Sequence, residues 1–224
     1  STIETNWAAV LPLFAEHYQV IAVELQAHGH TSDRDAPETF EQDADDVASL
    51  LKQLNISKAS IFGFSNGGST TMQIAIRYPE LVAKIVVASA AYKRDGFIPG
   101  FFDMMDTASL ESMPQPLKDA FLKLNPDRNA LQNMHDKDVA RMRSFKDWKD
   151  SDLQSIQAPA LIINADKDVT TVEHALKMSS LIPNAELLIL PGTHGSFLGE
   201  VCTAVPGSKM PELTVELVKE FLEK

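Results

Sequence analysis

The chain has 224 residues, of which 44% are hydrophobic, so it can bury one substantial core and fits one domain with an insertion better than two domains. The 31 acidic residues exceed the 20 basic residues and give a net charge of −11, which disfavours nucleic acid as a partner and otherwise serves solubility. No run of about 18 apolar residues occurs, so the sequence predicts no membrane-spanning segment.

The chain contains a single cysteine, Cys202, which excludes an internal disulfide and is compatible with a reducing compartment. Cys202 lies in a loop-like stretch without a strand-turn-helix pattern, which disfavours it as a nucleophile. We expect a cytoplasmic protein. The lack of a signal peptide at Ser1 carries little weight, because the helix-start pattern of the first four residues predicts that the sequence begins within a fold.

Short apolar runs alternate with longer amphipathic runs along the chain. The apolar runs predict buried strands at 18–25, 58–62, 84–88, 160–164 and 186–190. The amphipathic runs predict helices at 42–54, 69–78, 171–181 and 212–222. Continuous apolar strands separated by helices indicate an α/β fold with a mostly parallel sheet and helices on both of its faces.

The stretch 92–156 interrupts this alternation, because it contains no convincing strand. A helical stripe predicted in its middle is followed by Asn125-Pro126-Asp127, which reads as a helix cap with proline at the first helical position. A second stripe contains Val139, Met142 and Phe145. We therefore expect a small helical insertion between two sheet strands, which divides the chain into core residues 1–91, the insertion 92–156 and core residues 157–224.

A G-x-S-x-G pattern lies between the strand at 58–62 and the helix at 69–78. A serine hydroxyl is a poor nucleophile at neutral pH, and it reacts when a strained strand-to-helix turn exposes it to a base. This context predicts that Ser65 is a nucleophile rather than part of an ordinary glycine-rich turn. We also expect both flanking glycines, Gly63 and Gly67, to be required sterically, since side chains two positions either side of Ser65 would collide.

The base and the orienting acid are expected in the last third of the chain. The loop after the fourth predicted strand contains Asp166 and Asp168, and the loop after the fifth contains His194. The carboxyl ends of parallel strands lie on one edge of a sheet, so both loops are expected beside Ser65. The chain order Ser, Asp, His is the one found where an α/β sheet carries a catalytic triad. His194 would take the serine proton, and the aspartate would fix the imidazole tautomer.

The chain resembles the α/β-hydrolase superfamily, in the branch with a helical cap. The segments that carry the likeness are 24–32, 63–68, 158–168 and 191–194. The first of these is similar to the family's D-x-x-G-x-G-x-S turn, with Glu24 in place of the aspartate, and Ala165 replaces a usual glycine. Matching segments run from near residue 6 to the C-terminus, and together they are more specific than any one alone.

The resemblance implies that the acid is the second aspartate of its loop, Asp168, and that Asp166 caps that loop. Some relatives carry the acid after the strand before the cap, but 89–92 contains no carboxylate. The family also has a central strand with an oxyanion motif ahead of the helix that 6–11 resembles. A sheet without its middle strand would leave backbone groups unpaired, so we expect a longer protein with about three further strands upstream, which would supply the second oxyanion donor.

The remaining histidines fit structural or surface roles. His28 and His30 fit a structural role in the turn at 24–32, and His135 and His174 fit solvent-exposed helix surface. None of them has metal-ligand neighbours at suitable spacing, so we predict neither a metal nor another cofactor.

These residues predict acyl transfer through a covalent intermediate. Ser65 would attack a carbonyl, the Asn66 backbone N–H would donate to the oxyanion, and His194 would protonate the leaving group before activating water. The resemblance disfavours dehalogenase or epoxide hydrolase chemistry, which uses a carboxylate nucleophile in this superfamily.

Apolar side chains of the insertion favour a small or medium, mainly apolar carboxylic ester as the substrate. The pocket residues we expect are Phe64, Phe101, Met104, Met105 and Phe197. Scaffold and triad do not fix the leaving group, so hydrolysis of an amide, a thioester or a carbon–carbon bond, perhydrolysis and cyanohydrin cleavage stay open. A sensor that binds a small ligand without turnover is the alternative from another class of protein, and the sequence does not indicate an oligomeric state.

Overall fold

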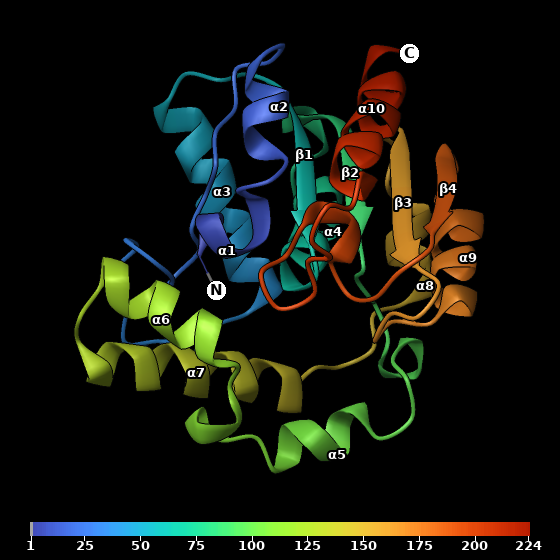
Figure 1. The fold of residues 1–224 in the computed structure, drawn as a ribbon. Helices are drawn as coiled ribbons and strands as arrows, with labels where there is room; N and C mark the ends of the chain where they lie inside the picture. The colour runs from blue at the N-terminus through green and yellow to red at the C-terminus, as the bar shows by residue number, and fades with distance from the viewer. Residues whose placement is uncertain (1) are drawn as a thin grey trace. The chain divides into compact units, whose positions relative to one another are not determined.

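A computed structural model describes residues 2–224, and the strands among them form one parallel sheet (Figure 1). The strands are β1 (Ala59–Phe64), β2 (Val82–Ala88), β3 (Ala160–Ala165) and β4 (Ala185–Leu190). They lie in the order β1-β2-β3-β4, with Gly63 beside Val87 and Val87 beside Ile162. Each pair of neighbouring parallel strands is joined by a crossover connection that contains at least one helix. The prediction of an α/β fold with a parallel sheet is therefore confirmed.

The helices are α1 (Ile3–Trp7), α2 (Leu11–Ala15), α3 (Phe40–Gln53), α4 (Asn66–Arg77), α5 (Phe101–Asp106), α6 (Gln115–Leu124), α7 (Arg128–Arg143), α8 (Asp150–Gln154), α9 (Val172–Leu181) and α10 (Met210–Glu223). Helices α1 to α3 precede the first strand, α4 to α9 lie between successive strands, and α10 follows the last strand. Short 3₁₀ turns lie at Pro79–Leu81, Arg94–Gly96, Leu110–Ser112 and Ser196–Leu198. The helices predicted at 42–54, 69–78, 171–181 and 212–222 correspond to α3, α4, α9 and α10, with ends that differ by up to three residues. The helix expected around 6–11 is interrupted, because a turn at 8–10 separates α1 from α2.

The chain divides into two compact units, which we describe separately. The sheet unit comprises Phe40–Ile98, Lys146–Gly195 and Glu216–Lys224. The helical unit comprises Ser1–Thr39, Pro99–Phe145 and Ser196–Val215.

The core of the sheet unit is centred on β2 and β3. Every residue of β3 is buried, as expected for a parallel strand covered on both faces. Helix α4 packs against β1, β2 and α3, whereas α9 packs against β3 and β4. Ile85 and Val87 of β2 are 0% exposed, and burial of such a side chain contributes about 1.5–3 kcal/mol. The same strand is tied to the end of α10 by the Lys84 ammonium, which donates to the carbonyls of Phe221 and Leu222 at 2.9 and 2.8 Å.

The helical unit has its own apolar cluster, in which α6 and α7 pack together. The buried members of the cluster are Ala27, Phe121, Leu131 and Met134. Helix α7 begins at Arg128, two residues later than the sequence predicts, because Asp127 is its N-cap and accepts a hydrogen bond from the Asn129 N–H at 2.8 Å. Pro126 thus lies before the cap rather than at the first helical position, since the aspartate side chain satisfies a free N–H of the helix start and proline cannot.

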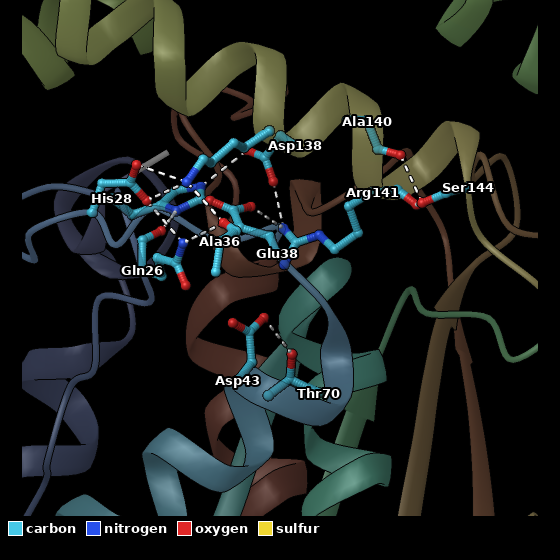
Figure 2. A network of polar contacts seen from close by, with 12 residues as sticks. Gln26, His28, Ala36, Glu38, Asp43, Thr70, Asp138, Ala140, Arg141 and Ser144 are labelled. Atoms are coloured by element: carbon cyan, nitrogen blue, oxygen red, sulfur yellow. Dashed lines mark hydrogen bonds and ion pairs between the residues drawn. The ribbon is translucent and has the colours of Figure 1, made fainter.

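A polar network ties α7 to the segment 26–38 within the helical unit (Figure 2). The His28 ring contacts the Gln26 carbonyl oxygen at 2.8 Å through Nδ1 and the Asp138 carboxylate at 2.9 Å through Nε2. Arg141, one turn further along α7, contacts both Asp138 and the buried Glu38. Burial disfavours the Asp138 carboxylate, but the charges of His28 and Arg141 outweigh it and lower its pKa. His28 therefore contacts structural partners, as expected for a residue of this turn.

The strand predicted at 18–25 is wrong. These residues form no β ladder, and Val20, Ile21 and Val23 are 39%, 37% and 38% exposed. Their β-branched side chains suit a strand, but that preference reflects packing against paired neighbours and does not create a strand without them.

Residues 2–224 contain no helix that is both long and apolar enough to cross a membrane.

Candidate active site

Ser65 occupies the single residue between β1 and α4, in a backbone conformation that few side chains adopt. Its φ is 56° and its ψ is −125°. The Ser65 N–H donates to the Ala88 carbonyl at 2.8 Å, and the Ser65 carbonyl accepts from the Gly68 N–H at 2.9 Å. Backbone held in such a region costs about 1–3 kcal/mol and occurs preferentially at functional sites. The strained strand-to-helix turn predicted from the sequence is therefore confirmed, and Ser65 is partly exposed there.

The glycines around Ser65 differ in whether a side chain would fit in their place. A Cβ on Gly63 would lie 2.0 Å from the Gly67 carbonyl oxygen, and a Cβ on Gly68 would lie 2.6 Å from the Ala90 Cβ. A Cβ on Gly67 would meet no heavy atom within 4 Å. The predicted collision is confirmed at Gly63 and wrong at Gly67, because the helix has turned by then. The third residue after the serine, Gly68, faces β2 instead.

The two helical glycines provide a matched pair. Gly68→Ala is expected to cost about 1–3 kcal/mol of unfolding free energy, because its methyl group overlaps Ala90. Gly67→Ala is expected to leave stability unchanged or to raise it by up to about 1 kcal/mol, since alanine loses less entropy in a helix. Urea unfolding of both variants measures the difference. Equal destabilisation by both would contradict the steric assignment.

The His194 imidazole bridges the two other predicted triad residues. Its Nε2 lies 3.0 Å from the Ser65 Oγ, and its Nδ1 lies 2.6 Å from the Asp168 Oδ1. The Asp168 side chain is 0% exposed and the His194 side chain is 27% exposed. A carboxylate only accepts, so Nδ1 donates to it and Nε2 is left to accept from the serine hydroxyl. The Phe64 ring packs against the imidazole, with 4.7 Å between the ring centroids.

The two aspartates of the acid loop have different partners. Asp166 accepts a hydrogen bond from the Gly192 N–H at 2.7 Å, which caps the loop as expected. Asp168 contacts His194. Burial disfavours the Asp168 carboxylate, but the hydrogen bond and charge of His194, together with donors from Ser89 and Val169, lower its pKa below the ordinary value.

Ser89 is a residue of this site that the sequence reasoning missed. Its hydroxyl donates to the Asp168 Oδ2 at 2.5 Å. The signal was present, because Ser89 is the first polar residue after the apolar run of β2, at the edge where the site was expected.

The other expected residues divide between the two units. Asn66 is the first residue of α4, so its N–H has no acceptor within the helix. Phe101, Met104, Met105 and Phe197 belong to the helical unit. Within that unit Met104 is 51% exposed, whereas Phe197 is 0% exposed.

Two histidines expected on the surface are buried, which corrects that prediction. His174 is 5% exposed and His135 is 8% exposed. The His174 Nε2 accepts from the Tyr92 N–H at 3.3 Å, and its ring stacks on the Tyr92 ring at 4.8 Å. His135 contacts Asp136 at 3.0 Å through Nδ1. An amphipathic pattern marks a histidine as polar, but it does not reveal a backbone donor or an aromatic face that pairs with the ring.

The buried His174 is expected to make folding sensitive to mildly acidic pH. Burial lowers its pKa to about 4, whereas an unfolded histidine titrates near its ordinary value of 6.5. Between these values the unfolded state binds more protons, so stability falls as the pH decreases through this window, by about 3 kcal/mol in total. His174→Gln should lose less stability between pH 7 and pH 4 than the wild type does, measured by urea unfolding. His30→Gln, at an exposed histidine, is the control. A loss of stability between pH 7 and pH 4 as large in His174→Gln as in the wild type would contradict this account.

No group of three or more His, Cys, Asp or Glu side chains within residues 2–224 is placed to hold a metal ion.

A strained serine turn, a histidine and a buried carboxylate on one edge of a parallel sheet are the arrangement expected of an α/β hydrolase, and the comparison with family models agrees with this class. The model described as the alpha/beta hydrolase fold matches residues 5–120, which is 116 of the 224 residues. The chain therefore belongs to the α/β-hydrolase fold family, and it is a hydrolase.

Individual relatives are consistent with this family. The chain is 24% identical over 236 residues to a putative esterase/lipase of Haemophilus influenzae, covering 98% of this chain and 79% of the relative. It is 30% identical over 193 residues to the serine hydrolase BPHL of Homo sapiens, covering 81% of this chain and 65% of the relative. Among solved structures, a serine hydrolase involved in carbazole degradation (CarC enzyme) superposes with a TM-score of 0.78 at 23% identity, covering 99% of this chain and 86% of that chain.

Proposed function

We propose that this hydrolase cleaves small or medium, mainly apolar carboxylic esters through an acyl-enzyme intermediate. The observation that carries the proposal is the continuous hydrogen-bonded relay from the Ser65 hydroxyl through His194 to Asp168, at 3.0 and 2.6 Å. Two curated relatives bear the names putative esterase/lipase and serine hydrolase, which supports the same chemistry.

In the first half of the reaction, the Ser65 Oγ attacks the ester carbonyl carbon while the His194 Nε2 takes the hydroxyl proton. The buried Asp168 carboxylate stabilises the imidazolium that forms. The Asn66 N–H, at the positive end of α4, donates to the carbonyl oxygen as it becomes an oxyanion. Collapse of the tetrahedral intermediate expels the alcohol, which receives the proton from His194.

In the second half, water takes the place of the alcohol. His194 accepts a proton from the water, the hydroxide attacks the acyl carbon, and Ser65 leaves with the proton returned by His194. The Phe64 ring covers one side of the imidazole and is 8% exposed, so it limits access of bulk water to the base from that side.

Covalent labelling and a substrate panel test the proposal. A fluorophosphonate probe should label the wild type and the control Ser60→Ala, whose serine is exposed on β1, but not Ser65→Ala. Short p-nitrophenyl esters should be turned over with a burst of one equivalent of p-nitrophenol, and faster than the matched anilides and 1,3-diketones.

Three outcomes would reject parts of the proposal. An unlabelled wild type would reject the serine nucleophile. Labelling with turnover of diketones or anilides but not esters would reject the ester as the substrate. Labelling with a single burst and no turnover would favour a small-ligand sensor.

A further inference from the structure

Ser89 lies directly after β2 in a conformation and an environment that require explanation. It is 1% exposed, and its φ of 51° is in the left-handed region, which disfavours residues with a Cβ. Its N–H continues the sheet ladder by donating to the Ile163 carbonyl at 2.8 Å. A buried polar side chain on strained backbone is retained only where surrounding contacts hold it.

The hydroxyl of Ser89 completes the hydrogen bonding of the Asp168 carboxylate. Oδ1 accepts from the His194 Nδ1 at 2.6 Å and from the Val169 N–H at 2.7 Å. Oδ2 accepts from the Ser89 hydroxyl at 2.5 Å and, at 3.4 Å, from the Ala165 N–H. The Ser89 hydroxyl is the shorter of these two Oδ2 contacts.

A carboxylate held on both oxygens cannot rotate freely about its Cβ–Cγ bond. Without the Ser89 hydroxyl, Oδ2 would keep only the long contact to the Ala165 N–H, and the carboxylate could turn out of the plane of the imidazole. A hydrogen bond to a charged group is strong and directional, so its loss affects both the position and the basicity of the carboxylate.

We propose that Ser89 is a positioning residue for catalysis, which orients the Asp168 carboxylate so that Oδ1 faces the His194 Nδ1. The proposal rests on the proposed function of the triad. Ser89 acts through Asp168 and does not contact the reacting atoms.

The variants separate the hydroxyl from the backbone strain. Ser89→Ala removes the hydroxyl and keeps a Cβ at positive φ, whereas Ser89→Gly removes both the hydroxyl and the strain. Ser69→Ala is the matched control, because Ser69 is also buried and its hydroxyl donates to the Ala91 carbonyl at 2.9 Å.

We expect kcat for a p-nitrophenyl ester to fall about 10–100-fold in both Ser89 variants with KM nearly unchanged, as for loss of a hydrogen bond to a charged group. The fluorophosphonate labelling rate should fall in parallel. In an Asp168→Asn background, Ser89→Ala should cost less than about twofold, because both residues act through one carboxylate. Ser69→Ala should change thermal stability and leave kcat unchanged.

A spectroscopic readout tests the inference independently of turnover. The low-field proton resonance of the His194 Nδ1–H should shift or broaden in Ser89→Ala and Ser89→Gly, and should be unchanged in Ser69→Ala.

Recovery of wild-type kcat in Ser89→Gly would overturn the inference, because strain rather than the hydroxyl would then matter. Full additivity with Asp168→Asn, or an unchanged low-field resonance, would also overturn it. Failure of the proposed function is distinguishable, since an unlabelled wild type rejects the nucleophile while the resonance still decides the role of Ser89.

Discussion

We expect Asp168→Asn to lower kcat for ester hydrolysis by about 10⁴ and Asp166→Asn to leave it within about twofold. The two aspartates are two residues apart in one loop and differ in what they contact. Asp168 accepts from the imidazole Nδ1 at 2.6 Å, and Asp166 accepts from the Gly192 N–H at 2.7 Å.

The size of the first effect follows from the tautomer of His194. An asparagine in place of Asp168 can present an amide N–H to Nδ1, which favours an unprotonated Nδ1 and a protonated Nε2. A protonated Nε2 cannot accept the Ser65 proton, and the imidazolium that forms during attack loses its buried counter-charge. The Asp166→Asn side chain keeps an oxygen that accepts the Gly192 N–H, so the loop should retain its shape.

Steady-state kinetics with a p-nitrophenyl ester and urea unfolding of both variants provide the measurement. KM should change little in Asp168→Asn, because the carboxylate is buried behind His194. A large loss of kcat in Asp166→Asn at unchanged stability would show that the acid has been assigned to the wrong aspartate.

The sequence predicts those parts of the site that depend on the order of strands, turns and helices along the chain. A strand, a G-x-S-x-G turn and a helix occur in succession around Ser65, and Asp168 and His194 each follow an apolar strand. Parallel strands bring their carboxyl ends together, so three residues far apart in the chain could be placed at one edge without knowledge of packing.

The features that the sequence did not predict depend on contacts between distant residues. The role of Ser89 follows from a hydroxyl that reaches Asp168 from another strand, and the burial of His174 follows from its pairing with Tyr92. The segment 18–25 failed as a strand because pairing, rather than composition, defines a ladder. The sequence predicts the same steric collision at Gly63 and Gly67, because each lies two positions from Ser65. The collision is absent at Gly67, since side chains follow a different period in a helix than in a strand.

Arg141→Met is expected to cost about 3–5 kcal/mol of unfolding free energy, the largest stability effect among our predictions. The Arg141 side chain is 4% exposed and lies 3.6 Å from the Glu38 carboxylate, which is itself 1% exposed (Figure 2). Removing the guanidinium leaves the Glu38 charge buried without this counter-charge, and a buried charge is costly unless it is paired. Asp138 should be affected less, since it is 28% exposed and keeps its contact with His28 at 2.9 Å.

The double variant Glu38→Gln/Arg141→Met distinguishes loss of packing from an uncompensated charge. Methionine retains much of the apolar volume of the arginine stem, and glutamine removes the charge that the single variant leaves behind. The double variant should therefore be more stable than Arg141→Met alone, although it carries one more substitution. Urea unfolding of the wild type, both single variants and the double variant closes the cycle. A double variant no more stable than Arg141→Met would mean that Arg141 stabilises α7 by packing its stem, and that the charge pair contributes little.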